Sequence, residues 1–188
     1  MCGRYSLFDE QDNAEIQKIV TEINQKYPEQ PIRTGEIFPT NTAPVLMTNG
    51  AVLSPEPVVW GFPKYQGSGV IINARAETAA GKKTFRDSLM KNRCIVPSTG
   101  FYEWDEKKHK YLFRLPNEQT LYMAGICKEY SGVKRYVILT TAANASMEDV
   151  HHRMPVILPK DKLQIWAANT DAALLYLHSE MPQLVRTG

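Results

Sequence analysis

The chain has 188 residues, with 22 lysines and arginines against 20 aspartates and glutamates, and a net charge of +2. Hydrophobic residues make up 43% and charged residues 22%, which excludes a disordered chain, a collagen-like repeat and a coiled coil. No apolar run approaches the roughly 18 residues of a membrane-spanning helix, and the first twelve residues lack the apolar core of a secretory signal. We therefore expect one compact domain over residues 1–188, located in the cytoplasm.

An amphipathic helix is predicted over residues 11–27. Asp9 or Asp12 can cap its first turn, and Pro28 and Pro31 end it because proline has no N–H to donate. The apolar side chains that recur at helical spacing on one face are Ile16, Ile19, Val20, Ile23 and Tyr27.

From Ala43 onward, short β-like runs dominate. Residues 43–48 and 51–54 flank Asn49-Gly50, which favours a type I′ hairpin turn. Further runs cover residues 57–62, 69–74, 93–97, 100–104, 110–115, 120–126 and 135–142. Short helices are predicted at 84–91, 161–168 and 171–177, and the basic run 82–93 is interpreted as a solvated helix face. Because there is no βαβ alternation, the pattern predicts an α+β fold, a curled, mostly antiparallel sheet or open barrel surrounded by short helices.

Motifs of several common enzyme classes are missing. The absence of GxGxxG, GxxxxGK[ST], GxSxG and HExxH weakens nucleotide-binding, esterase and zinc-protease interpretations. Three cysteines without a CxxC pair argue against a disulfide scaffold and a structural zinc site, and Cys94 and Cys127 lie in strand-like runs where we expect them to be inert. The polar residues that remain in small or apolar surroundings are Cys2, Asn73, Arg75, Glu103 and His151.

Cys2 is the most informative of these residues. A small second residue favours removal of Met1, which leaves cysteine with a thiol and an α-amine on adjacent carbons. The α-amine has a pKa near ~7.8 against ~10.4 for lysine, so far more of it is neutral and nucleophilic at pH 7. This pair can condense with an aldehyde to an imine and close a thiazolidine ring, or the amine can serve as base for an N-terminal thiol nucleophile. The alternative is that Cys2 is an incidental second residue.

Glu103, His151 and Asn73 are candidates for acid–base and positioning work. Apolar neighbours of Glu103 predict a raised pKa, although a position on the solvent face of its strand is the alternative. His151 lies between a predicted turn and an extended apolar run, and suits proton donation near neutral pH, with a capping or core role as the alternative. Asn73 can orient an aldehyde or sugar oxygen through its amide, or bond only to backbone.

Five motifs together resemble one family closely. They are MCGRY at the start, WGF at 60–62, INARAET at 72–78, GFYEW at 100–104 and HxRMP at 151–155. In this order they resemble the SOS response-associated peptidase (SRAP) family, the abasic-site processing proteins, and they extend over nearly the whole chain. The resemblance implies a single SRAP-like domain that traps abasic sites in single-stranded DNA.

The resemblance also implies roles for individual residues. Cys2 forms a thiazolidine with the ring-opened deoxyribose, Asn73 lies beside the adduct, and Glu103 and His151 assist proton transfer. Arg4 and Arg75 are expected to hold flanking phosphates without selecting a base sequence. Trp60 and Tyr65 are candidates for stacking on bases, with core packing as the alternative for Trp60. Lyase activity through the imine and self-removal of residues before Cys2 are further implied activities.

Two segments depart from the family pattern. Where the family commonly has R-Y-N-x-A-P-T, this chain has residues 34–40, TGEIFPT, so Glu36 replaces an asparagine near the expected DNA path. The segment after WGF is also short, which implies a smaller aromatic wedge.

Two other functions remain open at this stage. One is an N-terminal-nucleophile autopeptidase without an essential DNA role, and the other is a non-covalent reader of modified DNA. For the favoured function we expect single-stranded abasic-site DNA as partner, no cofactor, no metal, no membrane contact, a monomeric state and a location at the nucleoid when DNA is damaged.

Overall fold

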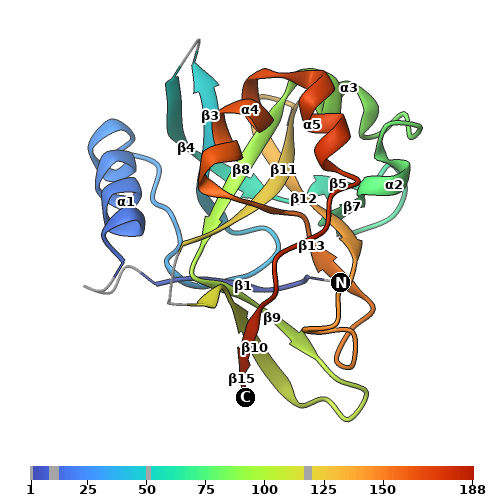
Figure 1. The fold of residues 1–188 in the computed structure, drawn as a ribbon. Coiled ribbons are helices and arrows are strands. Elements are labelled where there is room, and N and C mark those ends of the chain that lie inside the picture. The colour runs from blue at the N-terminus through green and yellow to red at the C-terminus, as the bar shows by residue number, and fades with distance from the viewer. Residues whose placement is uncertain (1, 9–12, 50–51, 117–119) are drawn as a thin grey trace.

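The computed structural model describes residues 2–8, 13–49, 52–116 and 120–188 (Figure 1). Five strands pair in the order β12–β4–β3–β8–β11, and β11 pairs back to β12, so they close into a barrel. All of these pairings are antiparallel except β4 with β12. The barrel strands are β3 (Thr42–Asn49), β4 (Val52–Trp60), β8 (Arg93–Ser98), β11 (Leu121–Tyr130) and β12 (Val133–Ala142). The α+β prediction is confirmed, and the barrel is closed rather than open because β12 bonds strands on both of its edges.

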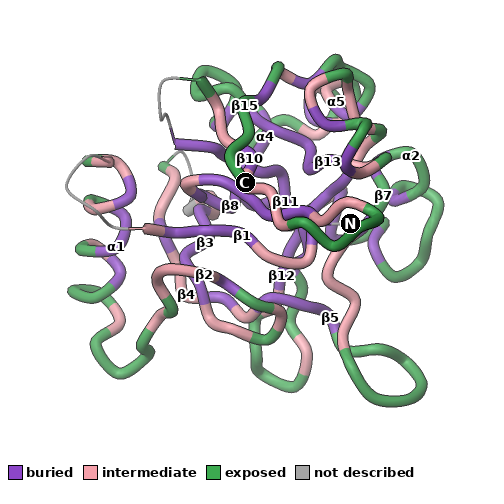
Figure 2. The backbone as a smooth tube through the Cα atoms, turned by 90° about the horizontal axis from the view of Figure 1, so that it is seen from below, coloured by how far each residue is buried: buried purple, intermediate pink, exposed green. Residues whose placement is uncertain are grey.

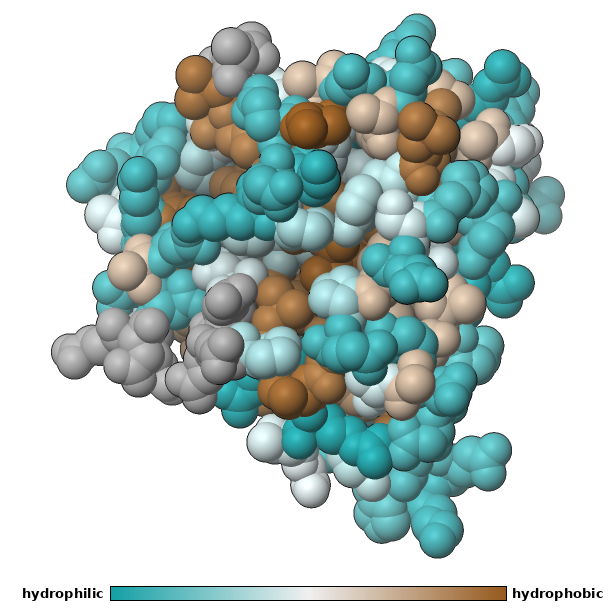
Figure 3. Space-filling view, in the orientation of Figure 1, coloured by the Kyte–Doolittle hydropathy of each residue, from teal (hydrophilic) through white to brown (hydrophobic). Residues whose placement is uncertain are grey.

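A second, antiparallel sheet lies below the barrel in Figure 1, in the order β15–β10–β9–β1–β2. Its strands are β1 (Tyr5–Leu7), β2 (Gly35–Ile37), β9 (Gly100–Trp104), β10 (Lys110–Arg114) and β15 (Val185–Thr187). The hairpin of β9 and β10 extends away from the body of the molecule, and Figure 3 shows a hydrophilic surface over it. Because β1 pairs with both β2 and β9, this sheet fixes the segment that carries Cys2.

Short strands attach to the barrel at its rim. β7 (Asn73–Arg75) runs parallel to β12, β13 (Arg153–Pro155) runs antiparallel to it, β14 (Ile157–Leu158) pairs with β11, and β5 (Phe62–Pro63) pairs with β6 (Val70–Ile71). Gly61, between β4 and β5, has φ of +111°, and a Cβ there would approach Val70 Cγ2 to 2.7 Å. Only glycine fits this turn, through which the chain leaves β4 before it returns to β12 as β7.

Helices cover the outside of the barrel. They are α1 (Ala14–Lys26), α2 (Ala76–Ala79), α3 (Arg86–Lys91), the 3-10 turn η2 (Lys160–Lys162), α4 (Leu163–Ala168) and α5 (Thr170–Tyr176). In α1 the predicted apolar face is buried except for Tyr27, which is half-buried. The side chain of Asn13 caps the helix by accepting from the Ile16 N–H, so the predicted aspartate caps are wrong. None of the helices in the described residues is long and apolar enough to cross a membrane.

The predicted hairpin is confirmed by the pairing of β3 with β4, in which Asn49 lies opposite Val52. This register places the turn one residue later than predicted, and its residues, 50 and 51, lie outside the described part of the chain. Buried segments follow β1, β3, β8, β11 and β12 in Figure 2, so the core lies inside the barrel and between it and the second sheet.

The basic run 82–93 is exposed at Lys82, Lys83, Arg86 and Lys91, as predicted, but Arg93 is buried. Its guanidinium donates to the carbonyls of Leu89, Met90, Trp166 and Ala167. Arg93 therefore satisfies backbone groups at the ends of α3 and α4 and holds both helices against β8.

Replacement of Arg93 by alanine is expected to lower the free energy of unfolding by about 3 kcal/mol, because it leaves several buried carbonyls without donors. Urea unfolding of Arg93→Ala measures this loss, and Arg86→Ala, at an exposed position of α3, is the control. A loss of under ~1 kcal/mol for Arg93→Ala would contradict the assigned role.

Candidate active site

Cys2 is held in a fixed position directly before β1. Its side chain is 1% exposed, and its Sγ donates to the carbonyl of Arg4 at 3.8 Å. Its own carbonyl accepts from Asn73 Nδ2 at 2.9 Å. Burial raises the pKa of the Cys2 thiol, and the nearby Glu103 carboxylate raises it further. The resting thiol is therefore neutral, and a base must take its proton before it can act as a nucleophile.

Asn73 reaches Cys2 because Trp60 and β12 fix the strand that carries it. Asn73 lies opposite Ile138 in the parallel pairing of β7 with β12. The indole N–H of Trp60 donates to the carbonyl of Ile72 at 3.0 Å, one residue before Asn73. Within the described part of the chain, the buried Oδ1 of Asn73 accepts no hydrogen bond. An unused acceptor thus lies in a side chain that already binds the Cys2 backbone.

Glu103 lies on β9 and is only 4% exposed. Burial raises the pKa of its carboxyl to about 7, which confirms the predicted direction. At neutral pH comparable amounts of both protonation forms are present, so the group can take or give a proton. Its carboxylate also raises the pKa of the Cys2 thiol, so the two groups are coupled electrostatically.

His151 precedes β13, and its ring is held by the backbone that follows. Nδ1 lies 3.0 Å from the N–H of Arg153 and 3.3 Å from the carbonyl of Arg153; acceptance of the shorter hydrogen bond assigns the proton of the neutral ring to Nε2. Burial lowers the pKa of His151, which favours this neutral form. In both Figure 1 and Figure 2 the segment that leads into β1 lies beside β7 and β13, so Cys2, Asn73 and His151 come from neighbouring segments.

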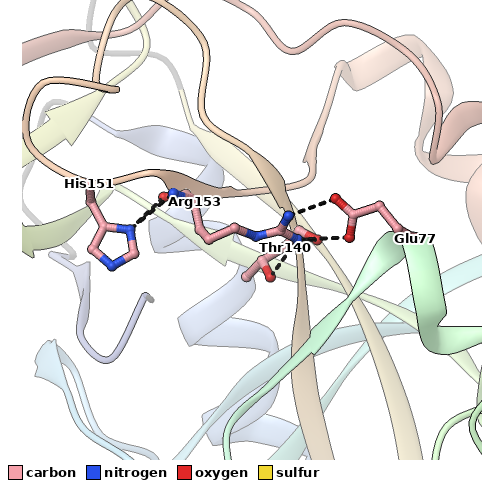
Figure 4. Close-up of polar contacts among 4 residues, drawn as sticks. All are labelled: Glu77, Thr140, His151 and Arg153. Carbon is pink, nitrogen blue, oxygen red and sulfur yellow. Dashed lines mark hydrogen bonds and ion pairs between the residues drawn. The ribbon is translucent and has the colours of Figure 1, made fainter.

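Figure 4 shows how Arg153 anchors this region. Its guanidinium binds both carboxylate oxygens of Glu77 on α2, at 2.6 and 2.9 Å, and donates to the carbonyl of Thr140 at 2.5 Å. Because Arg153 also donates its backbone N–H to His151, this ion pair fixes the β13 backbone that orients the imidazole. The sequence did not predict the pairing of Arg153 with Glu77. A signal was present, because an arginine next to the apolar residues Met154 and Pro155 needs a partner if its strand is buried.

Arg4 and Arg75 have different surroundings. The Arg4 guanidinium pairs with Glu36 at 3.1 Å and lies over the rings of Phe38 and Trp104. Arg75 is exposed at the start of α2. Either guanidinium group could bind a phosphate, but that of Arg4 is already paired with the Glu36 carboxylate.

The two aromatic candidates differ in exposure. Trp60 is fully buried between the rings of Tyr5 and Tyr136, whose centroids lie at 5.2 and 6.2 Å, so it has no face to offer a base. The predicted stacking role of Trp60 is therefore wrong, and its contact with Ile72 makes it a support for Asn73. Tyr65 is 99% exposed in the turn between β5 and β6, where its ring is available to bases.

A polar groove of about 730 Å³ borders the site, between the β9–β10 hairpin and the turn at residues 148–152. His151 and Trp104 are among its lining residues. The other lining side chains include the four carboxylates Asp105, Glu106, Glu148 and Asp149. Lys107 also lines the groove, and Asp149 is paired with Arg186, so part of this negative charge is offset. Within the described residues, no group of three or more His, Cys, Asp or Glu side chains could hold a metal ion.

A family model described as "SOS response associated peptidase (SRAP)" matches residues 1–185. The chain belongs to this family. "Abasic site processing protein YoqW" of Bacillus subtilis is similar, with 36% identity over 193 residues, 91% of this chain and 83% of the relative. "Abasic site processing protein YedK" of Escherichia coli shares 27% identity over 177 residues, 88% and 79% of the two chains.

A solved structure shares the fold of this chain. An X-ray structure of a protein from Bacteroides thetaiotaomicron matches with a TM-score of 0.78 and 23% identity, and covers 98% of this chain and 90% of that one. At this identity the match shows the fold alone. In this SRAP chain Cys2, Asn73, Glu103 and His151 come from four separate sequence motifs, and Asn73 contacts Cys2 directly.

Proposed function

We propose that this chain recognises abasic sites in single-stranded DNA and binds them covalently through Cys2 after Met1 is removed. The single observation that carries the proposal is the buried Cys2, whose carbonyl is held by Asn73 and whose thiol lies close to a carboxyl with a pKa of about 7. A buried ionisable group with a shifted pKa beside a nucleophilic side chain is typical of catalytic sites. The names of the relatives support abasic-site DNA as the substrate.

The chemistry begins with the α-amine of Cys2. The amine adds to the aldehyde of the ring-opened deoxyribose, and loss of one water gives an imine. The thiol then adds across the C=N bond, so that sulfur bonds to carbon and the nitrogen keeps a proton in the thiazolidine ring. Because the resting thiol is neutral, this last step needs a base, and we assign that role to the ionised form of Glu103.

His151 and Asn73 complete the proposed site. The Nε2–H of neutral His151 can donate a hydrogen bond to the sugar ring oxygen, and the protonated imidazolium can transfer its proton to that oxygen as the ring opens. Asn73 Oδ1 can accept from a sugar hydroxyl or from the Cys2 amine, which would satisfy an otherwise unpaired buried acceptor. β-Elimination from the imine would give the lyase activity. Attack of the Cys2 thiol on the peptide bond before it would transfer the acyl group to sulfur and free the amine, and hydrolysis of that thioester by water would complete self-processing, in line with the word peptidase in the family description.

Denaturing electrophoresis tests this function directly. The processed protein is incubated with a single-stranded oligonucleotide that contains one abasic site, and with the same oligonucleotide without it. We expect a heat-stable, slower-migrating species only with the abasic strand. An abasic duplex is expected to react more slowly, because its sugar must leave the stack to reach the chain terminus. If no adduct forms with the abasic strand, the covalent function is refuted, and an autopeptidase or a non-covalent reader becomes the better description.

Glu103→Gln is expected to slow crosslinking by ~10²-fold, because an amide cannot accept the thiol proton. In the unsubstituted protein the single-turnover rate should rise with pH and level off above about 7, as the carboxyl ionises. The variant should lose that inflection. Glu106→Gln, at an exposed position of the adjoining hairpin, is the matched control.

The same substitution should stabilise the fold above neutral pH. Burial raises the pKa of Glu103 from 4.5 to about 7, so the folded state binds the proton more tightly than the unfolded chain. Its stabilising contribution is full below pH 4.5 and is lost as pH rises through 7, a loss of about 3 kcal/mol that glutamine avoids. If Glu103→Gln crosslinks slowly but is at least as stable as the unsubstituted protein at pH 8, the slow rate comes from the loss of the base and not from unfolding. Unchanged single-turnover rates for Glu103→Gln would remove its role as base.

A further inference from the structure

Glu36 lies between two cations close to Cys2. One carboxylate oxygen, Oε2, is 3.1 Å from Arg4 Nη1, and the other, Oε1, is 2.5 Å from Lys110 Nζ. The three side chains come from three strands or strand ends of the second sheet, and all are about one third exposed. A solvent molecule or an anion can therefore reach the cluster from outside.

Aromatic rings hold the two cations in place independently of Glu36. The Arg4 guanidinium lies 4.3 Å from the ring centroid of Phe38 and 5.0 Å from that of Trp104. The Lys110 ammonium lies 4.0 Å from the centroid of Tyr102. The positions of the two cations therefore do not depend on the carboxylate alone.

The cluster is tied to the nucleophile through the Arg4 backbone. The carbonyl of Arg4 accepts from Cys2 Sγ and also from the Tyr102 N–H, at 2.9 Å. An anion bound between Arg4 and Lys110 therefore lies at a fixed place relative to Cys2. This link to Cys2 favours, as the anion, a phosphate that flanks a sugar held at Cys2.

We propose that Arg4 and Lys110 form one phosphodiester-binding site, and that the Glu36 carboxylate occupies this site until a phosphate of the DNA strand displaces it. The inference rests on the proposed function for the identity of the anion. It assigns a DNA contact to Lys110, and it makes Glu36 a competitor that weakens binding to strands without an abasic site.

Charge and donor geometry favour competition over simple structural pairing. Glu36 makes one contact with each cation, so it leaves most guanidinium hydrogens of Arg4 unused for a bidentate phosphate contact. The hydrogen bond from Lys110 lowers the pKa of Glu36, which keeps the carboxylate ionised at neutral pH. An ionised carboxylate and a phosphodiester repel each other at this distance, so they cannot share the site at full strength.

The test measures binding of undamaged DNA, which has no aldehyde and cannot crosslink. Fluorescence anisotropy with a labelled oligothymidylate compares the unsubstituted chain with Glu36→Gln. We expect Glu36→Gln to bind about fivefold to tenfold more tightly at low salt, and its log–log salt slope to steepen by about 0.7, the value for one added contact on a single strand. Glu56→Gln is the matched control, because Glu56 also binds a lysine, Lys134, at 2.5 Å.

Lys110 provides the second arm. Lys110→Gln should weaken binding and should abolish most of the gain when combined with Glu36→Gln, whereas Lys134→Gln should do neither. Unchanged or weaker binding by Glu36→Gln, or a gain that persists without Lys110, overturns the inference. Thermal unfolding of each variant shows that it is folded. If the abasic strand gives no adduct while Glu36→Gln still tightens binding, the covalent function fails and the phosphate site stands.

Discussion

Cys2→Ala is expected to abolish the heat-stable adduct with abasic single-stranded DNA, with residual crosslinking below ~1% of the unsubstituted protein. Alanine keeps the α-amine after Met1 removal but has no sulfur to close the ring. The imine that still forms hydrolyses on heating, so it should appear only after reduction with borohydride. Cys2→Ser should behave in the same way, because a hydroxyl is a poorer nucleophile for ring closure.

A second cysteine provides the control for this result. Cys94 is fully buried in β8, and Cys94→Ala should crosslink at the normal rate even if it lowers stability. Electrophoresis with and without borohydride separates the imine from the thiazolidine. A heat-stable adduct of normal yield from Cys2→Ala would assign the reaction to another residue and would refute the proposed mechanism.

Local sequence patterns predicted the elements better than their assembly. The apolar spacing of Ile16, Ile19, Val20 and Ile23 was sufficient for α1, since a helix depends on contacts within a few residues. Closure of the barrel depends on the parallel pairing of Arg135 and Tyr136 with Val59 and Trp60, which are far apart in the chain. The residue pattern within β4 or β12 does not predict that these two strands pair. An open barrel was therefore as consistent with the sequence as a closed one.

For the candidate site, too, the sequence predicted local properties of residues but not their distant contacts. The sequence indicated a raised pKa for Glu103 because its neighbours are apolar, and burial of the folded chain has this effect. It could not show that Trp60 points inward, since an aromatic residue at a strand end suits a core as well as a DNA surface. The Glu36 contacts with Arg4 and Lys110 were equally hidden, because they join residues from three separate strands.

Retaining any residue before Cys2 is expected to eliminate the heat-stable adduct as completely as Cys2→Ala does. In the sequence as encoded the Cys2 nitrogen is an amide, whose lone pair is delocalised into the carbonyl and does not attack an aldehyde. The remaining thiol can form only a hemithioacetal, which heating reverses. Cys2 is only 1% exposed, so an additional segment also competes with the sugar for the space around it.

A cleavable N-terminal extension tests this with one preparation. Before cleavage the protein should give no heat-stable adduct, and after a protease has exposed Cys2 the same sample should crosslink fully. Intact mass spectrometry identifies the N-terminus in each sample and should show an adduct equal to protein plus oligonucleotide minus one water. It also detects self-removal of the extension, which Cys2→Ala should prevent. A heat-stable adduct on molecules whose mass still includes the extension would rule out the thiazolidine, because that ring cannot form without a free amine at Cys2.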